Sequence, residues 1–114
     1  MIGTGPTPVR PPPEGIDLPG VHVLHTMDDS FAVHELLSRQ PRSAVIIGAG
    51  YIGTEMADAL THRGLHVTLV EQLGSVLTTV DADLGADVAR ELARHGVATG
   101  GASSASPGRA GGCR

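Results

Sequence analysis

One glycine-rich segment has the residue types and spacing to bind a ligand. Residues 48–53 read Gly-Ala-Gly-Tyr-Ile-Gly and match the pattern G-x-G-x-x-G. At this spacing the glycines can serve three purposes: a tight turn, a close approach of the backbone to a pyrophosphate, and close packing of a helix on a strand. The pattern alone is a weak signal, because glycine-rich turns are common. It becomes specific only where a strand precedes it and a helix follows.

The flanking residues supply that context. Residues 43–47 are a β-branched run that predicts a strand buried on both faces of a parallel sheet. Apolar residues then recur every fourth position until Gly64, which predicts a helix over about 51–63. Residues 66–70 predict a second buried strand. The fold class is therefore α/β, with a partial Rossmann-like βαβ unit.

This βαβ unit is expected to hold the ADP half of a nicotinamide cofactor, NAD(H), on the N-terminus of its helix. Gly48 would permit the turn, Gly50 would admit the pyrophosphate, and Gly53 would let helix and strand pack closely. The free N–H groups of the helix, together with its dipole, favour a bound phosphate. A structural glycine turn without a ligand is the alternative interpretation.

Glu71 ends the second predicted strand, 23 positions after the first glycine and near the expected spacing of about 20. An acidic residue at this distance can accept a hydrogen bond from the ribose 2′-OH of NAD(H). A 2′-phosphate at the same place would be repelled by the carboxylate, so we expect a preference for NADH over NADPH. A solvated glutamate at a strand end is the alternative.

The sequence predicts that the whole chain divides into three segments. Residues 1–20 contain six of the eight prolines and are expected to be a connector. Residues 21–97 are expected to form an incomplete NAD-binding βαβ domain, which includes a short edge strand at Val21 and Val23 and a helix capped by Thr26 and Asp29.

A second helix should follow the βαβ unit. Leu84, Val88 and Leu92 repeat every fourth residue, and Gly96 stands after its expected end. Val97 looks like the start of another strand. From residue 98 the apolar pattern stops, so residues 98–114 are expected to be a disordered tail.

Composition excludes several classes of function. The net charge is −4 and the eight basic residues are scattered arginines, so we expect no binding to nucleic acid. No apolar stretch approaches the roughly 20 residues of a membrane span, and no signal peptide is recognised, so a cytoplasmic location is expected. The single cysteine, Cys113, is interpreted as incidental. Two histidine pairs, His22 with His25 and His62 with His66, lack further ligands, so no metal site is expected.

The sequence around the glycine motif resembles the flavin-dependent pyridine nucleotide-disulfide oxidoreductases. Residues 44–55 are similar to the family's NAD-binding segment, most of all to its NADH oxidase and coenzyme A-disulfide reductase branch. Residues 2–5, with Pro8, resemble the family's second FAD-contacting segment. The resemblance covers about residues 1–97 and implies a Rossmann-like fold with NAD(H) and FAD as the cofactors of the parent family.

The resemblance also implies roles for individual residues. Tyr51 would lie where an aromatic side chain gates the nicotinamide pocket, and Glu55 where a carboxylate lies near the nicotinamide. Ile52 belongs to the same cofactor-binding segment, and Thr4 and Gly5 would contact FAD. From position alone, Tyr51 and Glu55 could equally be exposed residues of the first helical turn.

Two family features, an earlier glycine-rich FAD motif and an upstream redox cysteine, have no counterpart in this sequence. No catalytic residue is therefore assigned, and we expect FAD not to be held by this chain alone. Three hypotheses stay open: a fragment of an FAD-dependent NAD(P)H oxidoreductase, a free-standing NADH-binding module stabilised as a homodimer, and a remnant without catalysis. The electron acceptor is not determined by any of these residues.

Overall fold

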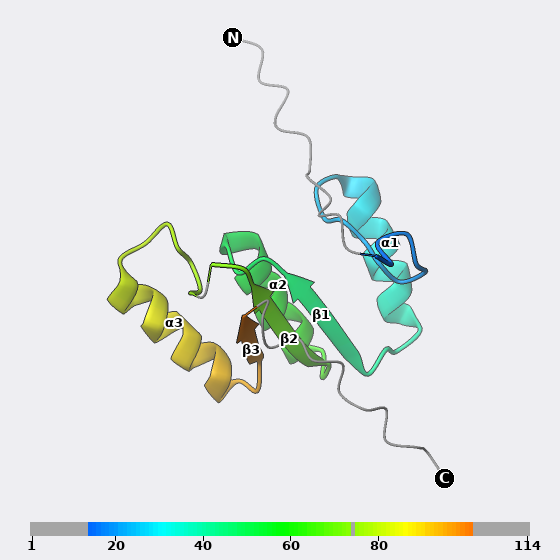
Figure 1. Ribbon diagram of the computed structural model, residues 1–114. Coiled ribbons are helices and arrows are strands. Elements are labelled where there is room, and N and C mark those ends of the chain that lie inside the picture. The colour runs from blue at the N-terminus through cyan, green and yellow to red at the C-terminus, as the bar shows by residue number, and fades with distance from the viewer. Residues whose placement is uncertain (1–13, 74, 102–114) are drawn as a thin grey trace. The chain divides into compact units, whose positions relative to one another are not determined.

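The computed structural model describes residues 14–73 and 75–101 and divides the chain into two units, Met1–Pro41 and Arg42–Arg114 (Figure 1). The first unit contains helix α1 (Met27–Ser38). The second unit contains five elements, in the order β1 (Ser43–Ile47), α2 (Tyr51–His62), β2 (His66–Glu71), α3 (Ala82–Arg94) and β3 (Ala98–Gly101). Helix α1, which the sequence assigned to the NAD-binding domain, thus falls in the first unit.

Helix α1 begins at the capping box predicted from the sequence. The Asp29 carboxylate accepts a hydrogen bond from the Thr26 N–H at 2.7 Å, and the Thr26 hydroxyl accepts one from the Asp29 N–H at 3.2 Å. Hydrogen bonds to the carboxylate, from the Thr26 N–H first, then from the Thr26 side chain and the His25 N–H, lower the pKa of Asp29. The edge strand expected at Val21 and Val23 is wrong. The Val21 N–H instead donates to the Leu18 carbonyl in a turn.

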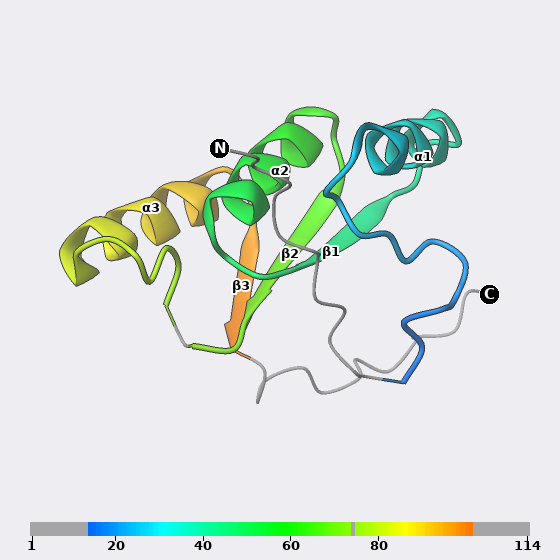
Figure 2. The ribbon, with the colours of Figure 1, turned by 90° about the horizontal axis from the view of Figure 1, so that it is seen from above.

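The second unit is built on a parallel three-stranded sheet of order β1-β2-β3. Ala44 pairs with Val67 and Ile46 with Leu69, which places these four side chains on one face. Figure 2 shows α2 and α3 on the same face of this sheet. Val67 and Leu69 are accordingly 2% and 1% exposed and form the centre of the core.

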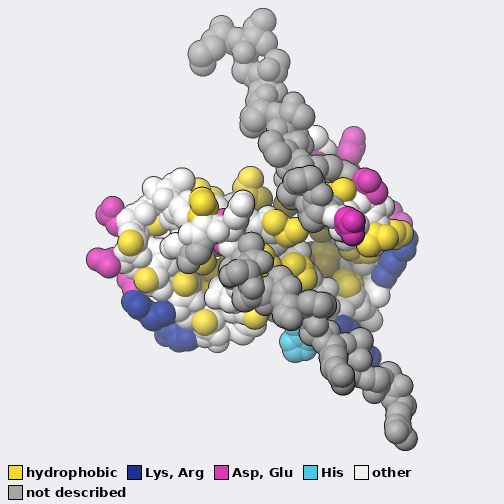
Figure 3. All heavy atoms as spheres, viewed as in Figure 1, with side chains coloured by type: hydrophobic (Ala, Val, Ile, Leu, Met, Phe, Trp, Pro, Cys, Tyr) yellow, Lys and Arg dark blue, Asp and Glu magenta, His cyan; other side chains and the backbone are white. Residues whose placement is uncertain are grey.

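The prediction that β1 is buried on both faces is wrong. Val45 and Ile47 are each 68% exposed, and Ala44 and Ile46 between them are only partly buried. The cause is the connectivity. Both helices that follow a strand of this sheet return over the same face, so no described element of the unit covers the opposite one. Figure 3 shows hydrophobic side chains gathered over the region of β1 and β2.

The sheet also extends beyond its predicted end. Val97 is 3% exposed, and after it Ala98 to Gly101 pair with β2, from Thr68 to Glu71. Strand pairing uses the backbone N–H and C=O groups, which small residues supply as well as large ones, so the loss of apolar side chains did not end the strand. The prediction that residues 98–101 belong to a disordered tail is therefore wrong. Residues 102–114 lie outside the described residues.

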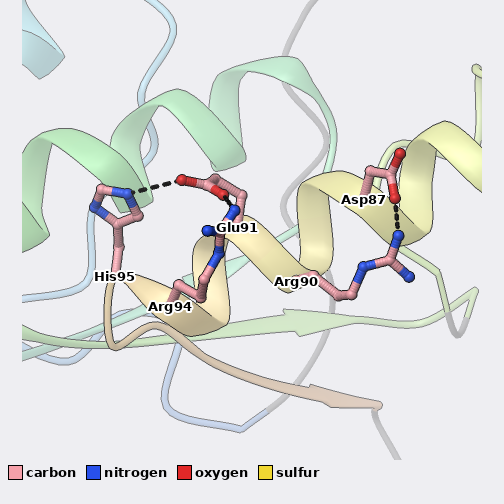
Figure 4. A network of polar contacts seen from close by, with 5 residues as sticks. All are labelled: Asp87, Arg90, Glu91, Arg94 and His95. Carbon is pink, nitrogen blue, oxygen red and sulfur yellow. Dashed lines mark hydrogen bonds and ion pairs between the residues drawn. The ribbon is translucent and has the colours of Figure 1, made fainter.

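Helix α3 carries ion pairs along its solvent-facing surface (Figure 4). Asp87 pairs with Arg90, and Glu91 contacts both Arg94 and His95. All these side chains are at least 46% exposed, so each pair contributes little to stability.

Of the helices in the described residues, none is both long and apolar enough to cross a membrane.

Gly85 fixes how α3 packs against the segment that precedes it. A methyl group at this position would lie 2.6 Å from the Val76 carbonyl oxygen. We expect Gly85→Ala to lower the free energy of unfolding by about 1–3 kcal/mol through overpacking, although alanine is the better helix former. Urea denaturation would measure the change. Leu84→Ala, at a 53% exposed neighbour, should have a smaller effect. A stabilised Gly85→Ala variant would contradict this packing.

Candidate functional site

The site begins with a turn at the carboxyl end of β1. Gly48 has φ +104°, a conformation that residues with a side chain rarely adopt. Its N–H donates to the Val70 carbonyl at 2.8 Å, which continues the contact between β1 and β2 by one residue. The turn therefore starts from a fixed position at the edge where the strands end.

Gly53 allows α2 to pack directly on this turn. A methyl group at position 53 would lie 1.9 Å from the Gly48 carbonyl oxygen and 3.5 Å from the Ile46 side chain. The first of these distances is far below van der Waals contact, so only glycine fits without a shift of the backbone. This geometry is the one expected from the last glycine of the motif.

Gly50 differs from both of its partners in the motif. Its φ of −77° suits any residue, and no described atom beyond its chain neighbours lies within 4 Å of where its methyl group would be. Neither the backbone conformation nor the packing thus requires glycine at this position. Gly50 is also the N-cap of α2, and no side chain caps this helix. The space beside it, next to free helix N–H groups, has the character of an anion site.

Glu71, which ends β2 as the sequence predicted, lies at this turn. Its carboxylate accepts hydrogen bonds from the Ala49 N–H at 2.7 Å and from the Leu73 N–H at 3.0 Å. The hydrogen bond from Ala49, followed by that from Leu73, lowers the pKa of Glu71. Glu71 is therefore an anion at neutral pH. A carboxylate offers about four acceptor positions, so two hydrogen bonds leave room for a ligand hydroxyl.

The structure thus brings the three motif glycines and Glu71 together. Tyr51 and Ile52, in the first turn of α2, are 60% and 63% exposed, and Glu55 is also exposed. These three side chains contribute no described contact to the turn. Thr4 and Gly5, for which the sequence predicted contacts with FAD, lie outside the described residues.

Two residues of the site escaped the sequence analysis. Ala49 is 1% exposed, and its carbonyl accepts a hydrogen bond from the Leu77 N–H at 2.8 Å. Leu77 itself has φ +53°. Both contacts to the turn use backbone groups, and nothing in the residue types of Ala49 and Leu77 indicates them.

A hollow of about 350 Å³ adjoins Glu71 on the side of α3. Its lining combines small and polar residues from β2, β3, the following loop and α3, among them Ser75, Ala89 and Thr99. Within residues 14–73 and 75–101, no group of three or more His, Cys, Asp or Glu side chains could hold a metal ion. The chemistry that this site supports is binding of an anionic group together with a hydroxyl.

Comparisons with known proteins agree with this geometry. The sequence profile of the family described as pyridine nucleotide-disulphide oxidoreductase matches residues 1–105. A CoA-dependent NAD(P)H sulfur oxidoreductase of Pyrococcus furiosus is 37% identical over 97 residues, which are 83% of this chain and 22% of that protein. An NADH oxidase of Methanocaldococcus jannaschii is 36% identical over 99 residues, 85% of this chain and 22% of that protein.

Solved structures give the same result. The water-forming NADH oxidase from Lactobacillus brevis bound to NADH superposes with a TM-score of 0.78 at 30% identity, over 83% of this chain and 21% of that one. An NAD-dependent persulfide reductase from A. fulgidus gives a TM-score of 0.77 at 33% identity, over 82% of this chain and 18% of that one. The chain therefore spans about a fifth of the length of these relatives.

The contrast between Gly50 and Gly53 is testable with a matched pair of alanine variants. Gly53→Ala should destabilise the fold by about 1–3 kcal/mol, because its methyl group meets the Gly48 carbonyl. Gly50→Ala should leave the free energy of unfolding nearly unchanged, because its methyl group enters open space. Chemical denaturation of both variants measures this difference. Equal destabilisation would show that protein packing, and not a ligand, explains glycine at position 50.

The lowered pKa of Glu71 predicts a dependence of stability on pH. Because the pKa is lower in the folded chain than in the unfolded one, the carboxylate stabilises the fold above a pH of about 4.3. This contribution is lost as the pH falls through the folded pKa. Glu71→Gln should therefore show a shallower loss of stability than the parent chain as the pH falls below about 4.3. If the stability of both chains falls equally steeply with pH, the N–H groups of Ala49 and Leu73 do not donate hydrogen bonds to the carboxylate in solution.

Proposed function

We propose, from the premise that the chain belongs to the pyridine nucleotide-disulphide oxidoreductase family, that it binds the ADP part of NAD(H) at the turn of residues 48–53. In this proposal the chain is the NAD-binding part of an FAD-dependent NAD(P)H oxidoreductase. It corresponds to about 22% of the length of its relatives.

One observation carries this proposal: Gly50 is required neither by the backbone nor by packing. It lies at the uncapped N-terminus of α2, with open space where a side chain would stand. A pyrophosphate that approaches the backbone would explain both the glycine and the missing cap. Gly48 and Gly53 would hold the turn in place around this group.

Glu71 would select the nucleotide. Its carboxylate, anchored by the N–H groups of Ala49 and Leu73, would accept a hydrogen bond from the ribose 2′-OH. A 2′-phosphate would bring negative charge against this anion. The hollow beside Glu71 offers space for the adenosine end of the cofactor.

The remaining site residues belong to the proposal through the family resemblance. Tyr51 and Glu55 would face the nicotinamide, and their exposure on α2 leaves them accessible to a bound cofactor. NAD(H), when bound, supplies a hydride carrier, and the residues of this chain bind and orient it. FAD, which Thr4 and Gly5 would contact, remains an expectation from the resemblance.

Two finer expectations complete the proposal. The protein would act in the cytoplasm. A chain that acts alone would form a homodimer, which could cover the exposed Val45 and Ile47 side chains of β1. Light scattering of the purified chain measures whether this homodimer forms.

Nucleotide titration tests the proposal. We expect the 114-residue chain to bind NADH with low affinity, because the described contacts serve only the ADP part. Its affinity for NADPH should be lower still. Glu71→Ala should narrow the preference, because it removes both the acceptor for the 2′-OH and the charge that repels a 2′-phosphate. Isothermal titration calorimetry measures the dissociation constants of both nucleotides.

Gly50→Ala and Glu14→Ala serve as matched variants. Gly50→Ala should weaken the binding of both nucleotides about equally, since the pyrophosphate is common to them. Glu14→Ala removes a carboxylate outside the second unit and should change neither affinity. Tighter binding of NADPH than of NADH by the parent chain would contradict the role of Glu71, and Gly50→Ala binding as tightly as the parent would contradict the phosphate site.

A further inference from the structure

The loop between β2 and α3 contains a leucine in an unusual backbone conformation. Among the described residues other than glycine, positive φ values occur at Gln40, with +54°, and at Leu77, with +53°. Gln40 stands two positions after the end of α1, where helices commonly place a left-handed residue. Leu77 follows no helix. A bulky residue in this region is an outlier that needs a cause.

The cause lies in what the Leu77 backbone contacts. Its N–H donates to the Ala49 carbonyl at 2.8 Å, and its own carbonyl accepts a hydrogen bond from the Val80 N–H at 3.0 Å. The N–H of Ala49 is held by the Glu71 carboxylate at 2.7 Å. Both polar backbone groups of Ala49 are therefore fixed by residues remote in sequence, the last residue of β2 and a residue of the loop that follows it. Ala49 directly precedes Gly50, where the proposed phosphate site lies.

The loop is anchored on its other side as well. Val76 and Leu77 are 7% and 8% exposed, so their side chains belong to the core. The Val76 carbonyl lies against Gly85 of α3, where even a methyl group would come within 2.6 Å. The loop is thus held between α3 and the turn of residues 48–53, which explains how a strained conformation persists at Leu77.

We propose that Leu77 is a positioning residue, whose left-handed backbone holds the Ala49 carbonyl and thereby sets the shape of the phosphate-binding turn. This inference rests on the proposed function for its effect on NADH. The strain at Leu77 is the local cost of directing its N–H at Ala49 while its side chain stays in the core. A residue that merely filled the core would not need this conformation.

Two substitutions separate the backbone from the side chain. Leu77→Ile keeps an apolar side chain of the same size but disfavours positive φ, because isoleucine is β-branched. Leu77→Gly favours positive φ but removes the side chain. We expect Leu77→Ile to weaken NADH binding on the order of tenfold. Leu77→Gly should change the affinity for NADH by less than about twofold, although it should lower the stability of the fold more than Leu77→Ile does. Leu60→Ala is the control, since it removes core volume in the last turn of α2, at the opposite end of this helix from the turn of residues 48–53, and should lower stability without changing NADH affinity.

Amide hydrogen exchange at position 77 gives a readout that needs no cofactor. The amide should be protected in the parent chain and in Leu77→Gly, and should exchange on the order of tenfold faster relative to global unfolding in Leu77→Ile. If the parent chain binds no NADH, the proposed function fails, and this exchange pattern still decides the role of Leu77. Equal protection in all three chains, or a loss of NADH affinity in Leu77→Gly as large as in Leu77→Ile, would overturn the inference.

Discussion

The contact between Gly53 and the Gly48 carbonyl oxygen determines how the second unit is built. A side chain at position 53 would come within 1.9 Å of that oxygen, so α2 can begin directly after the turn only because glycine is there. The helix N-terminus is consequently delivered to the carboxyl end of β1. That is also where β2 ends, in parallel register, with Glu71 as its last residue. A free helix N-terminus and a carboxylate thus meet at one edge of the sheet.

The turn between β1 and α2 does not hold its shape by itself. Gly48 and Gly50 have little intrinsic preference for one conformation, and flexible glycines lose more entropy on ordering than other residues. The hydrogen bonds from Ala49 to Glu71 and from Leu77 to Ala49 offset this cost. A turn that is shaped before the ligand arrives binds it at a lower entropic penalty. Residues remote in sequence therefore belong to the site as much as the glycines do.

The sheet has two unlike faces, and this asymmetry follows from its connections. Helices α2 and α3 cover the face with Val67 and Leu69, which are almost fully buried. The face with Val45 and Ile47 stays largely exposed in the described part of the chain. Strand β1 is nevertheless apolar on both faces, with Val45 and Ile47 on the exposed one, as strands of doubly covered parallel sheets are. The composition of β1 thus fits a sheet with two covered faces, while the described residues cover one.

The sequence by itself determined the elements around the site and the positions of the three motif glycines and of Glu71 at the end of β2. Helical periodicity, the Thr26 capping box, Gly64 with φ +86° and the three motif glycines are local signals, because each depends on neighbours within a few positions. Only the tertiary structure decided the exposure of Val45, the pairing of β3 and the contact from Leu77 to Ala49. All three depend on which distant segments lie side by side. The pairing of β3 and the contact from Leu77 to Ala49 use backbone groups, and Val45 is exposed because no described element covers its face of the sheet. Residue types do not indicate either of these features.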